Sequence, residues 1–262
     1  MGTGVGRDHV DLLIRVGTSG WSYPSWVGPF YPPKTSAARM LSTYAQTFTT
    51  VEAHSTHRRL PTSAAVERWA ASVPPGFHFA PKAHAGITHR RATDGLEERF
   101  TALHAALAPL GDRLGPVLYV LPHRQPDLDR LDALLAGLRG PNAVTGLRGP
   151  NAVTGLRGPA GAVFELAPPW RVEPVFERLE TAGASLAVVD REDDPGLDQP
   201  VLGPVAYFRL RRATYDDADL DRWAERLAAE GAERPVYAFV KHDEEGDGPR
   251  YAQGLVTRLE QG

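Results

Sequence analysis

The sequence predicts an α/β protein, a single (β/α)8 barrel, and three observations support this fold. Short apolar runs rich in β-branched residues alternate with stretches whose apolar residues recur at helical spacing. Eight predicted strands, most of them followed by such a helical stretch, fit in 262 residues, a length typical of one closed barrel. Hydrophobic residues form 42% of the chain, enough for a sizeable core. An open, doubly wound sheet has the same local pattern and is the alternative.

The predicted strands are short and are bounded by Gly, Pro or charged residues. They are Leu12–Val16, Thr50–His54, Phe77–Lys82, Val117–Leu121, Val163–Leu166, Leu186–Val189, Ala206–Leu210 and Val236–Val240. Because alternate residues of a strand point to opposite faces, each strand should send one set of side chains into the barrel and the other toward the helices.

The stretches between the strands carry apolar residues three or four positions apart, as amphipathic helices do. These residues are Leu41, Tyr44, Phe48, Val66, Trp69, Val73, Leu96, Phe100, Leu103, Leu107, Leu110, Leu128, Leu131, Leu135, Val172, Val175, Phe176, Leu179, Leu220, Trp223, Leu227, Leu255 and Leu259. Asp94 followed by Glu97 predicts a capping box, and Gly183 predicts a helix C-terminus. Residues 190–203 are too polar and Pro-rich for a helix, so the sixth helix should be missing or replaced by a loop.

We expect residues 1–262 to form one domain with a flexible N-terminus over residues 1–11. A nonapeptide, GLRGPNAVT, occurs at 137–145 and again at 146–154, and a partial third copy follows. Tandem duplication in the gene explains this repeat. The repeat loop, residues 137–158, leads from a helix into a strand, so it should lie on the amino-terminal face of the barrel, away from the usual site.

Composition excludes several classes of protein. The chain has no cysteine, which rules out disulfides, thiolate nucleophiles and Cys-type zinc sites. Its net charge of −3 argues against a protein that coats DNA, although a local basic patch is compatible with it. No apolar run approaches 18 residues and the start lacks a signal-peptide pattern, so we expect a cytoplasmic protein without a membrane partner. Phosphate-loop, dinucleotide, zincin and hydrolase-elbow motifs are absent from the sequence, so no nucleotide cofactor is predicted.

In a barrel of this kind, every segment that follows a strand lies on the carboxyl-terminal face. Seven of the nine histidines lie in these segments or at the strand ends that feed them: His54, His57, His78, His84, His89, His123 and His242. Eight arginines accompany them: Arg58, Arg59, Arg90, Arg91, Arg124, Arg171, Arg211 and Arg212. This concentration predicts a small anionic or phosphate-bearing ligand, whereas the alternative is that loops are simply polar and solvated.

Four ionisable residues interrupt the apolar strands, namely Glu52, Lys82, Glu165 and Arg209. Each is costly to bury singly, but together they can neutralise one another at the barrel mouth. In the functional interpretation, Glu52 or Glu165 is a general acid or base, and Lys82 and Arg209 stabilise an anion. In the alternative, the four side chains only plug the barrel.

The segment GTSGWSYPSWVGPFYPP, which follows the first strand, is rich in aromatic residues that either form a wall for a ligand or cap the barrel. The candidate ligand-binding residues are Ser19, Trp21, Tyr23, Trp26, His54, Ser55, Trp170, Asp190, Lys241, His242 and Asp243.

Three functions remain open at this point. The first is an enzyme, a hydrolase, lyase or isomerase, that uses acid/base chemistry on a small phosphorylated or carboxylated ligand. The second is a metal-dependent, isomerase- or endonuclease-like barrel, because imidazole and carboxylate groups suit divalent metals. Its candidate ligands are Glu52, His54, Glu165, Asp190 and His242. The third, which is not favoured, is non-catalytic binding of a nucleotide or nucleic acid.

The motifs GTSGWSYPSWVGPFYPP, YAQTFTTVEAHST, RWAASVPPGFHFAPKA and LGDRLGPVLYVLP, with the Glu of VFEL, resemble the domain of unknown function 72 family. Its YecE-like members are TIM-type barrels without an established activity. The resemblance covers nearly the whole chain and implies a pocket at these matching positions: Gly17, Ser19, Gly20, Trp21, Tyr23, Trp26, Glu52, Ser55, Thr56, Lys82, Glu165, Trp170, Arg209 and Asp243.

Several polar positions of the family pattern differ in this chain. An Asn, a Gln, an Arg-His pair and an Asn pair are replaced, in that order, by His54, Val120, Leu166, Ala167, Lys241 and His242. Either the ligand differs from that of the family or the activity has decayed.

Overall fold

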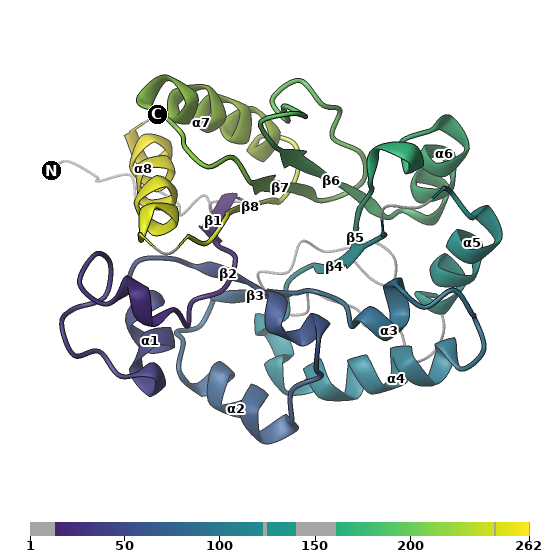
Figure 1. Ribbon diagram of the computed structural model, residues 1–262, viewed down its shortest axis with the longest axis horizontal. Helices are drawn as coiled ribbons and strands as arrows, with labels where there is room; N and C mark the ends of the chain where they lie inside the picture. Colours follow the sequence, from purple (N-terminus) through teal and green to yellow (C-terminus); the bar gives the residue numbers. More distant parts are fainter. Residues whose placement is uncertain (1–13, 123–124, 140–160, 244, 262) are drawn as a thin grey trace, which may run out of the picture.

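The computed structural model describes residues 14–122, 125–139, 161–243 and 245–261, in which eight parallel strands are surrounded by helices (Figure 1). The strands are β1 (Ile14–Thr18), β2 (Thr50–Ala53), β3 (His78–Pro81), β4 (Val117–Val120), β5 (Ala162–Glu165), β6 (Ser185–Asp190), β7 (Ala206–Leu210) and β8 (Val236–Val240). Every predicted strand is confirmed, with its ends shifted by no more than a few residues.

The strands form one ring. Six of them pair in the order β1-β8-β7-β6-β5-β4, and β2 pairs with β3. The two sheets meet on both sides near the carboxyl ends of the strands, where Gly20 N donates to Glu52 O (2.9 Å) and Ala83 N donates to Leu118 O (2.8 Å). Because the first strand pairs with the last, the predicted barrel is confirmed and the open sheet is excluded.

Helices follow all but one of the strands. They are α1 (Ala37–Tyr44), α2 (Ser63–Ala71), α3 (Ala85–Thr88), α4 (Leu96–Leu107), α5 (Leu128–Gly137), α6 (Glu173–Ala182), α7 (Asp217–Gly231) and α8 (Asp247–Gln261). Short 3-10 helices are η1 (Pro24–Trp26), η2 (His54–His57), η3 (Ala108–Arg113) and η5 (Pro168–Trp170). Residues 191–205, between β6 and β7, are all described and contain no helix, which confirms the prediction for the sixth unit.

One helix cap agrees with the sequence prediction and one does not. Gly183 ends α6 in the left-handed conformation (φ 70°), as predicted. The capping box at Asp94 and Glu97 is wrong, because Gly95 takes the N-cap position of α4 with φ 63°. Asp94 therefore lies one residue too early to cap, and its carboxylate contacts Arg90 at 3.4 Å instead.

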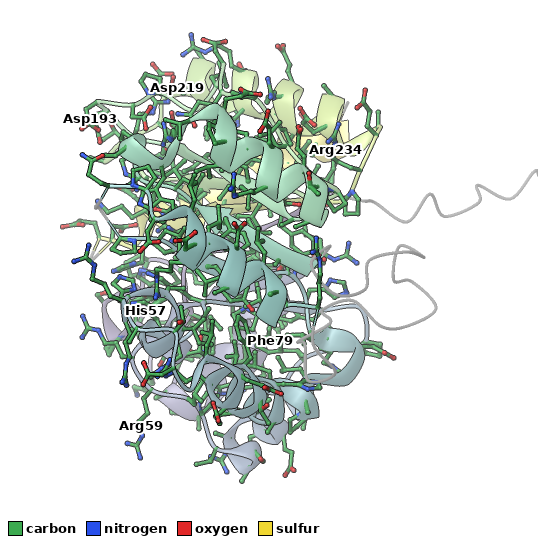
Figure 2. All side chains as sticks on the ribbon, turned by 90° about the vertical axis from the view of Figure 1, so that its right-hand side faces the viewer. His57, Arg59, Phe79, Asp193, Asp219 and Arg234 are labelled. Atoms are coloured by element: carbon green, nitrogen blue, oxygen red, sulfur yellow. The ribbon has the colours of Figure 1, made fainter. Side chains whose placement is uncertain are left out.

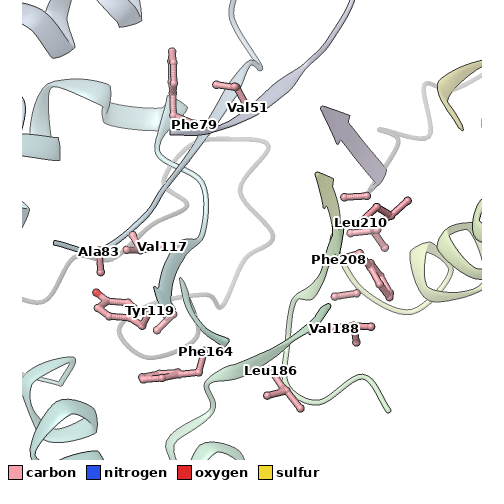
Figure 3. Packing of buried hydrophobic residues seen from close by; sticks show 14 of the residues in the cluster. Val51, Phe79, Ala83, Val117, Tyr119, Phe164, Leu186, Val188, Phe208 and Leu210 are labelled. Atoms are coloured by element: carbon pink, nitrogen blue, oxygen red, sulfur yellow. The ribbon is translucent and has the colours of Figure 1, made fainter. Parts of the chain in front are cut away.

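The buried apolar side chains divide between the two faces of the strands. One cluster fills the barrel and includes Leu118, Val163 and Phe239. The other lies between the strands and the helices, where Phe164 and Phe208 point outward from the ring (Figure 3). Side chains therefore alternate along each strand as predicted, and this alternation determines which polar residues can reach the barrel interior.

The single domain stays a prediction. Residues 1–11 and residues 140–158 of the predicted repeat loop lie outside the described residues. No helix in the described part of the chain is long and apolar enough to cross a membrane.

Close approach of β1 to β2 yields a test of the barrel. A methyl group at Gly17 would lie 2.2 Å from the backbone oxygen of Thr50. We expect Gly17→Ala to lower the free energy of unfolding by about 1–3 kcal/mol, because backbone cannot move aside cheaply. Gly254→Ala in α8 is the matched control, since its methyl group would meet only the flexible ends of two side chains, Leu220 at 3.1 Å and Arg258 at 3.5 Å. Urea unfolding should separate the two variants, and equal losses would contradict the close packing of the two strands.

Candidate functional site

The loops that follow the strands lie together at one end of the barrel. Figure 2 shows His57, Arg59 and Asp193 along this end and Arg234 at the opposite one. His57 follows β2 and Asp193 follows β6, whereas Arg234 precedes β8. This end is therefore the carboxyl-terminal face, where the predicted site residues lie on strand ends and loops.

A buried ion-pair network connects three strands at this face. Arg209 of β7 makes a two-bond contact with Glu52 of β2, in which Nε donates to Oε2 and Nη2 donates to Oε1, both at 2.8 Å. The Nη1 atom of Arg209 donates to Oε2 of Glu165 on β5. Glu52 is 0% exposed and Glu165 is 6% exposed. Three of the four predicted catalytic residues are thus in direct contact, in the arrangement in which arginine and carboxylate bind most strongly.

Further donors saturate the Glu52 carboxylate. Ser19 Oγ donates to Oε1 (2.8 Å) and Tyr207 Oη donates to Oε2 (3.0 Å). Arg211 Nη2 donates both to Oε1 of Glu52 (3.0 Å) and to Oγ of Ser19 (2.8 Å). Ser19, which the sequence predicts to bind a ligand, therefore contacts the network directly.

The environment of the two carboxylates keeps both of them ionised. Burial acts to raise the pKa of Glu52, but the Arg209 and Arg211 guanidiniums outweigh it and hold that pKa well below its usual range. Burial likewise acts to raise the pKa of Glu165, and Arg209, Arg211 and Arg191 lower it overall. A carboxylate with a lowered pKa is a poor proton acceptor near neutral pH. These surroundings therefore suit charge stabilisation better than the general-base role predicted from the sequence.

Lys82, the fourth predicted catalytic residue, is half-buried at the end of β3. Burial and the nearby Arg209 lower the pKa of its ammonium, while Glu165 and Glu52 partly offset them. Unlike Arg209, it has no ion pair within 4.0 Å in the described part of the chain. Its charge therefore lies next to the network without a direct ion pair to it.

Three near-parallel rings lie beside the network. The ring centroids of Tyr23 and His242 are 4.9 Å apart, and those of His54 and His242 are 5.7 Å apart. Burial first, with Arg211 adding to it, lowers the pKa of both His54 and His242. The Nδ1 atom of His54 is buried and has no hydrogen-bond partner among the described residues. Neutral imidazoles in this position can accept a proton from a neighbouring group.

Four other predicted ligand-binding residues are held by packing or lie in solvent. Trp21 packs edge-on against Trp69 of α2, with ring centroids 5.3 Å apart. Trp26 is fully buried, and its indole nitrogen donates to the backbone of the loop after β8. Trp170 is buried, and Ser55 is exposed on η2. None of these four forms a hydrogen bond to the Glu52 network within the described residues.

The predicted residues Asp190 and Asp243 hold loops in place. The Asp190 carboxylate accepts from the backbone of Gly196 (2.8 Å) and from the side chains of Arg212 and Tyr215. Asp243 accepts from three backbone N–H groups at the start of α8. Lys241, another predicted residue, is exposed. The lone pairs of both carboxylates are therefore largely occupied by local structure.

The network also contains three residues that are not among the candidate catalytic and ligand-binding residues, although Arg211 belongs to the arginines predicted on this face. Tyr207 and Arg211 contact Glu52, and Arg191 Nη2 donates to Oε1 of Glu165 at 2.9 Å. The signal for Tyr207 was its position two residues before Arg209, which places both side chains on the inner face of β7. Arg211 continues the same spacing beyond the strand. Arg191 lies in the irregular loop after β6, where no periodicity applies.

The five candidate metal ligands do not converge. Across the described ranges, no group of three or more His, Asp or Glu side chains is placed to hold a metal ion. The Arg209 guanidinium lies between Glu52 and Glu165 and contacts both. The donor set here therefore fits a guanidinium better than a divalent cation.

Comparison with known proteins identifies relatives along nearly the whole chain. The sequence model of the family described as "Protein of unknown function DUF72" matches residues 15–262. The UPF0759 protein YecE of Escherichia coli K12 is 30% identical over 110 residues, which are 42% of this chain and 38% of YecE. The aligned segment is therefore less than half of either protein.

Solved structures show the same fold. A DUF72 family protein from Enterococcus faecalis has a TM-score of 0.74 at 17% identity, covering 94% of this chain and 95% of that one. A DUF72 family protein from Thermotoga maritima has a TM-score of 0.70 at 20% identity, covering 94% and 99%. SacUVDE has a TM-score of 0.57 at 8% identity, covering 95% and 98%. The resemblance seen in the sequence motifs is confirmed: this chain belongs to the DUF72 family of proteins of unknown function.

Proposed function

We propose that the protein is an enzyme that binds a small anion, phosphorylated or carboxylated, at the carboxyl-terminal face and acts on it by acid/base chemistry. The observation that carries this proposal is an excess of positive charge around two buried carboxylates, when Lys82 is protonated. The two carboxylates of Glu52 and Glu165 face four cations: Lys82, Arg191, Arg209 and Arg211. Two positive charges are left over. Because unneutralised buried charge is costly, a bound anion would stabilise this network.

Arg209 and Arg211 have different roles in this proposal. All three nitrogens of the Arg209 guanidinium already donate to carboxylates, so this residue is a scaffold. Arg211 has a buried Nε without a hydrogen-bond partner in the described part of the chain. Lys82, which has no ion pair within 4.0 Å among the described residues, is the second cation available to a ligand. An anion held between Arg211 and Lys82 would satisfy these donors.

Proton transfer in the proposed reaction is assigned to His54 and Lys82 rather than to the carboxylates. His54 is neutral above its lowered pKa and can accept a proton. Lys82 loses its proton more readily than an ordinary lysine. The ionised Glu52 and Glu165 then stabilise positive charge that develops beside them.

Substitution of the two arginines separates the scaffold from the binding group. Arg209→Leu leaves two buried carboxylates without their main partner, so we expect the free energy of unfolding to fall by about 3–5 kcal/mol. Arg211→Leu leaves Glu52 paired with Arg209, so we expect a loss of about 1–2 kcal/mol but about tenfold weaker binding of orthophosphate or pyruvate. Urea unfolding and isothermal titration calorimetry measure the two effects.

The exposed Arg58 supplies the control for this pair. Arg58→Leu should change neither stability nor anion binding. The proposal fails if Arg211→Leu binds both probes as tightly as the wild-type protein does.

The pH dependence of lactate binding tests the role of Lys82 in holding an anion, because lactate carries a carboxylate but no reactive carbonyl group. A protonated ammonium attracts the anion, so affinity should be full below the pKa of Lys82 and fall as the pH rises through it. Because this pKa is lowered from 10.5, the fall should begin at a pH below that value. Lys82→Arg keeps its charge throughout, so its affinity should stay constant over the same range. Calorimetric titrations between about pH 7 and 10 make the comparison, and a parallel decline in Lys82→Arg would exclude Lys82 as the binding cation.

A further inference from the structure

Lysine is rare in this chain. Of 29 basic side chains only three are lysines, Lys34, Lys82 and Lys241. Lys34 and Lys241 are exposed, whereas Lys82 lies beside the buried network. A guanidinium stays protonated in proteins, but an ammonium can lose its proton and become a nucleophilic amine. The one lysine among the arginines of the site therefore permits chemistry that they do not.

The backbone at Lys82 is held on both sides. Its N–H donates to the carbonyl of Ala53 (3.1 Å), and its own carbonyl accepts from Thr56 Oγ1 (2.6 Å). The root of the side chain is thereby fixed to the end of β2 and to η2. Such a rigid origin suits a group that must meet a reacting carbon in one orientation.

Charged and titratable groups surround Lys82 from four elements. They are Glu52 on β2, His54 and His57 on η2, Glu165 on β5, and Arg209 and Arg211 on or just after β7. Burial and the arginines lower the pKa of Lys82, and the carboxylates partly offset them. Desolvation and a neighbouring cation are the conditions under which lysines act as amine nucleophiles.

We propose that Lys82 is a nucleophile that forms a Schiff base with a small 2-oxo acid, whose carboxylate is held by Arg211. This inference rests on the proposed function and narrows its substrate class to anions that carry a reactive carbonyl group. Such an acid carries its carboxylate on the carbon next to the carbonyl carbon, so Arg211 and Lys82 would bind adjacent groups of one ligand. The free amine of Lys82 then replaces the ammonium as the group that contacts the ligand.

The reaction balances with the groups present. Protonated Lys82 gives one proton to His54, and its lone pair adds to the carbonyl carbon as the C=O π pair moves to oxygen. A second proton passes from nitrogen to that oxygen, which gives a neutral carbinolamine. The protonated His54 returns its proton to the hydroxyl group, the C–O bond breaks, and water leaves. Ammonium and ketone thus become iminium and water, with no net change in protons or charge.

The two carboxylates suit the product of this step. Glu52 and Glu165 remain ionised because their pKa values are lowered. They lie near enough to Lys82 to interact with its charge. An iminium carries the same single positive charge as the ammonium that it replaces, so the network stabilises it without rearrangement.

Reductive trapping tests the proposal on the full-length protein. Pyruvate and sodium cyanoborohydride should attach one reduced adduct to Lys82 about tenfold faster than to the exposed Lys34 or Lys241, as followed by peptide mass mapping. Lys34→Arg should label as the wild type does, and Lys82→Arg should lose the fast adduct. Acetaldehyde, which has no carboxylate, provides the second probe. Arg211→Leu should slow labelling by pyruvate about tenfold more than labelling by acetaldehyde.

The outcomes distinguish this inference from the proposed function. Reversible calorimetric binding of pyruvate, with Lys82 labelled no faster than Lys34, overturns the Schiff base and leaves the anion site standing. Failure of both orthophosphate and pyruvate to bind overturns the proposed function as well. Fast labelling of Lys82 that depends equally on Arg211 for both probes supports the nucleophile and overturns the assignment of Arg211 to the carboxylate.

Discussion

The contact between Glu52 and Arg209 is the interaction on which the site depends. It joins β2 to β7, which are not neighbours in the ring, and Arg209 extends it to Glu165 on β5. A fully buried carboxylate is tolerated only with strong partners, and here the guanidinium satisfies two carboxylates at once. All nitrogens of the Arg209 guanidinium donate to carboxylates, and Arg191 pairs with Glu165. Arg211 and Lys82 are therefore the cations of the network that we propose for ligand binding. In the proposed function, the stability of the barrel and its preference for an anion thus depend on the same contact.

Much of the fold and part of the site could be predicted from the alternation of side chains along each strand and from the parallel order of the strands. Strand parity places Glu52, Lys82, Glu165 and Arg209 inside the barrel, and parallel closure brings their ends to one face. The same alternation along β6 places Asp190 on the opposite face from these four residues. Val189 belongs to the cluster inside the barrel and Val188 to the outer one, so Asp190 shares the outer face. Its carboxylate accordingly anchors a loop.

The roles of other site residues could be assigned only from their contacts in the folded structure. Glu52 and Glu165 are acids in apolar strands, a pattern that indicates proton transfer as readily as charge pairing. The number of arginines around them decides between the two, and no periodicity reveals that number. The aromatic segment after β1 also has residues whose roles the sequence does not distinguish. Tyr23 stacks on His242, whereas Trp21, two residues earlier, packs on α2. Contacts between segments far apart in the sequence separate these two residues.

The arginines and the lysine at this face differ in whether they can lose a proton, and this difference constrains any reaction there. Arg209 and Arg211 carry permanent charge, so they can fix carboxylates but cannot take part in proton transfer. Lys82 and His54 can change charge, and burial lowers the pKa of each, which favours their neutral forms. When Lys82 has given up its proton, its amine and the His54 imidazole lie near two ionised carboxylates, which can stabilise positive charge that forms on a ligand. The proposed Schiff-base chemistry therefore fits these charges better than chemistry that requires a carboxylate base.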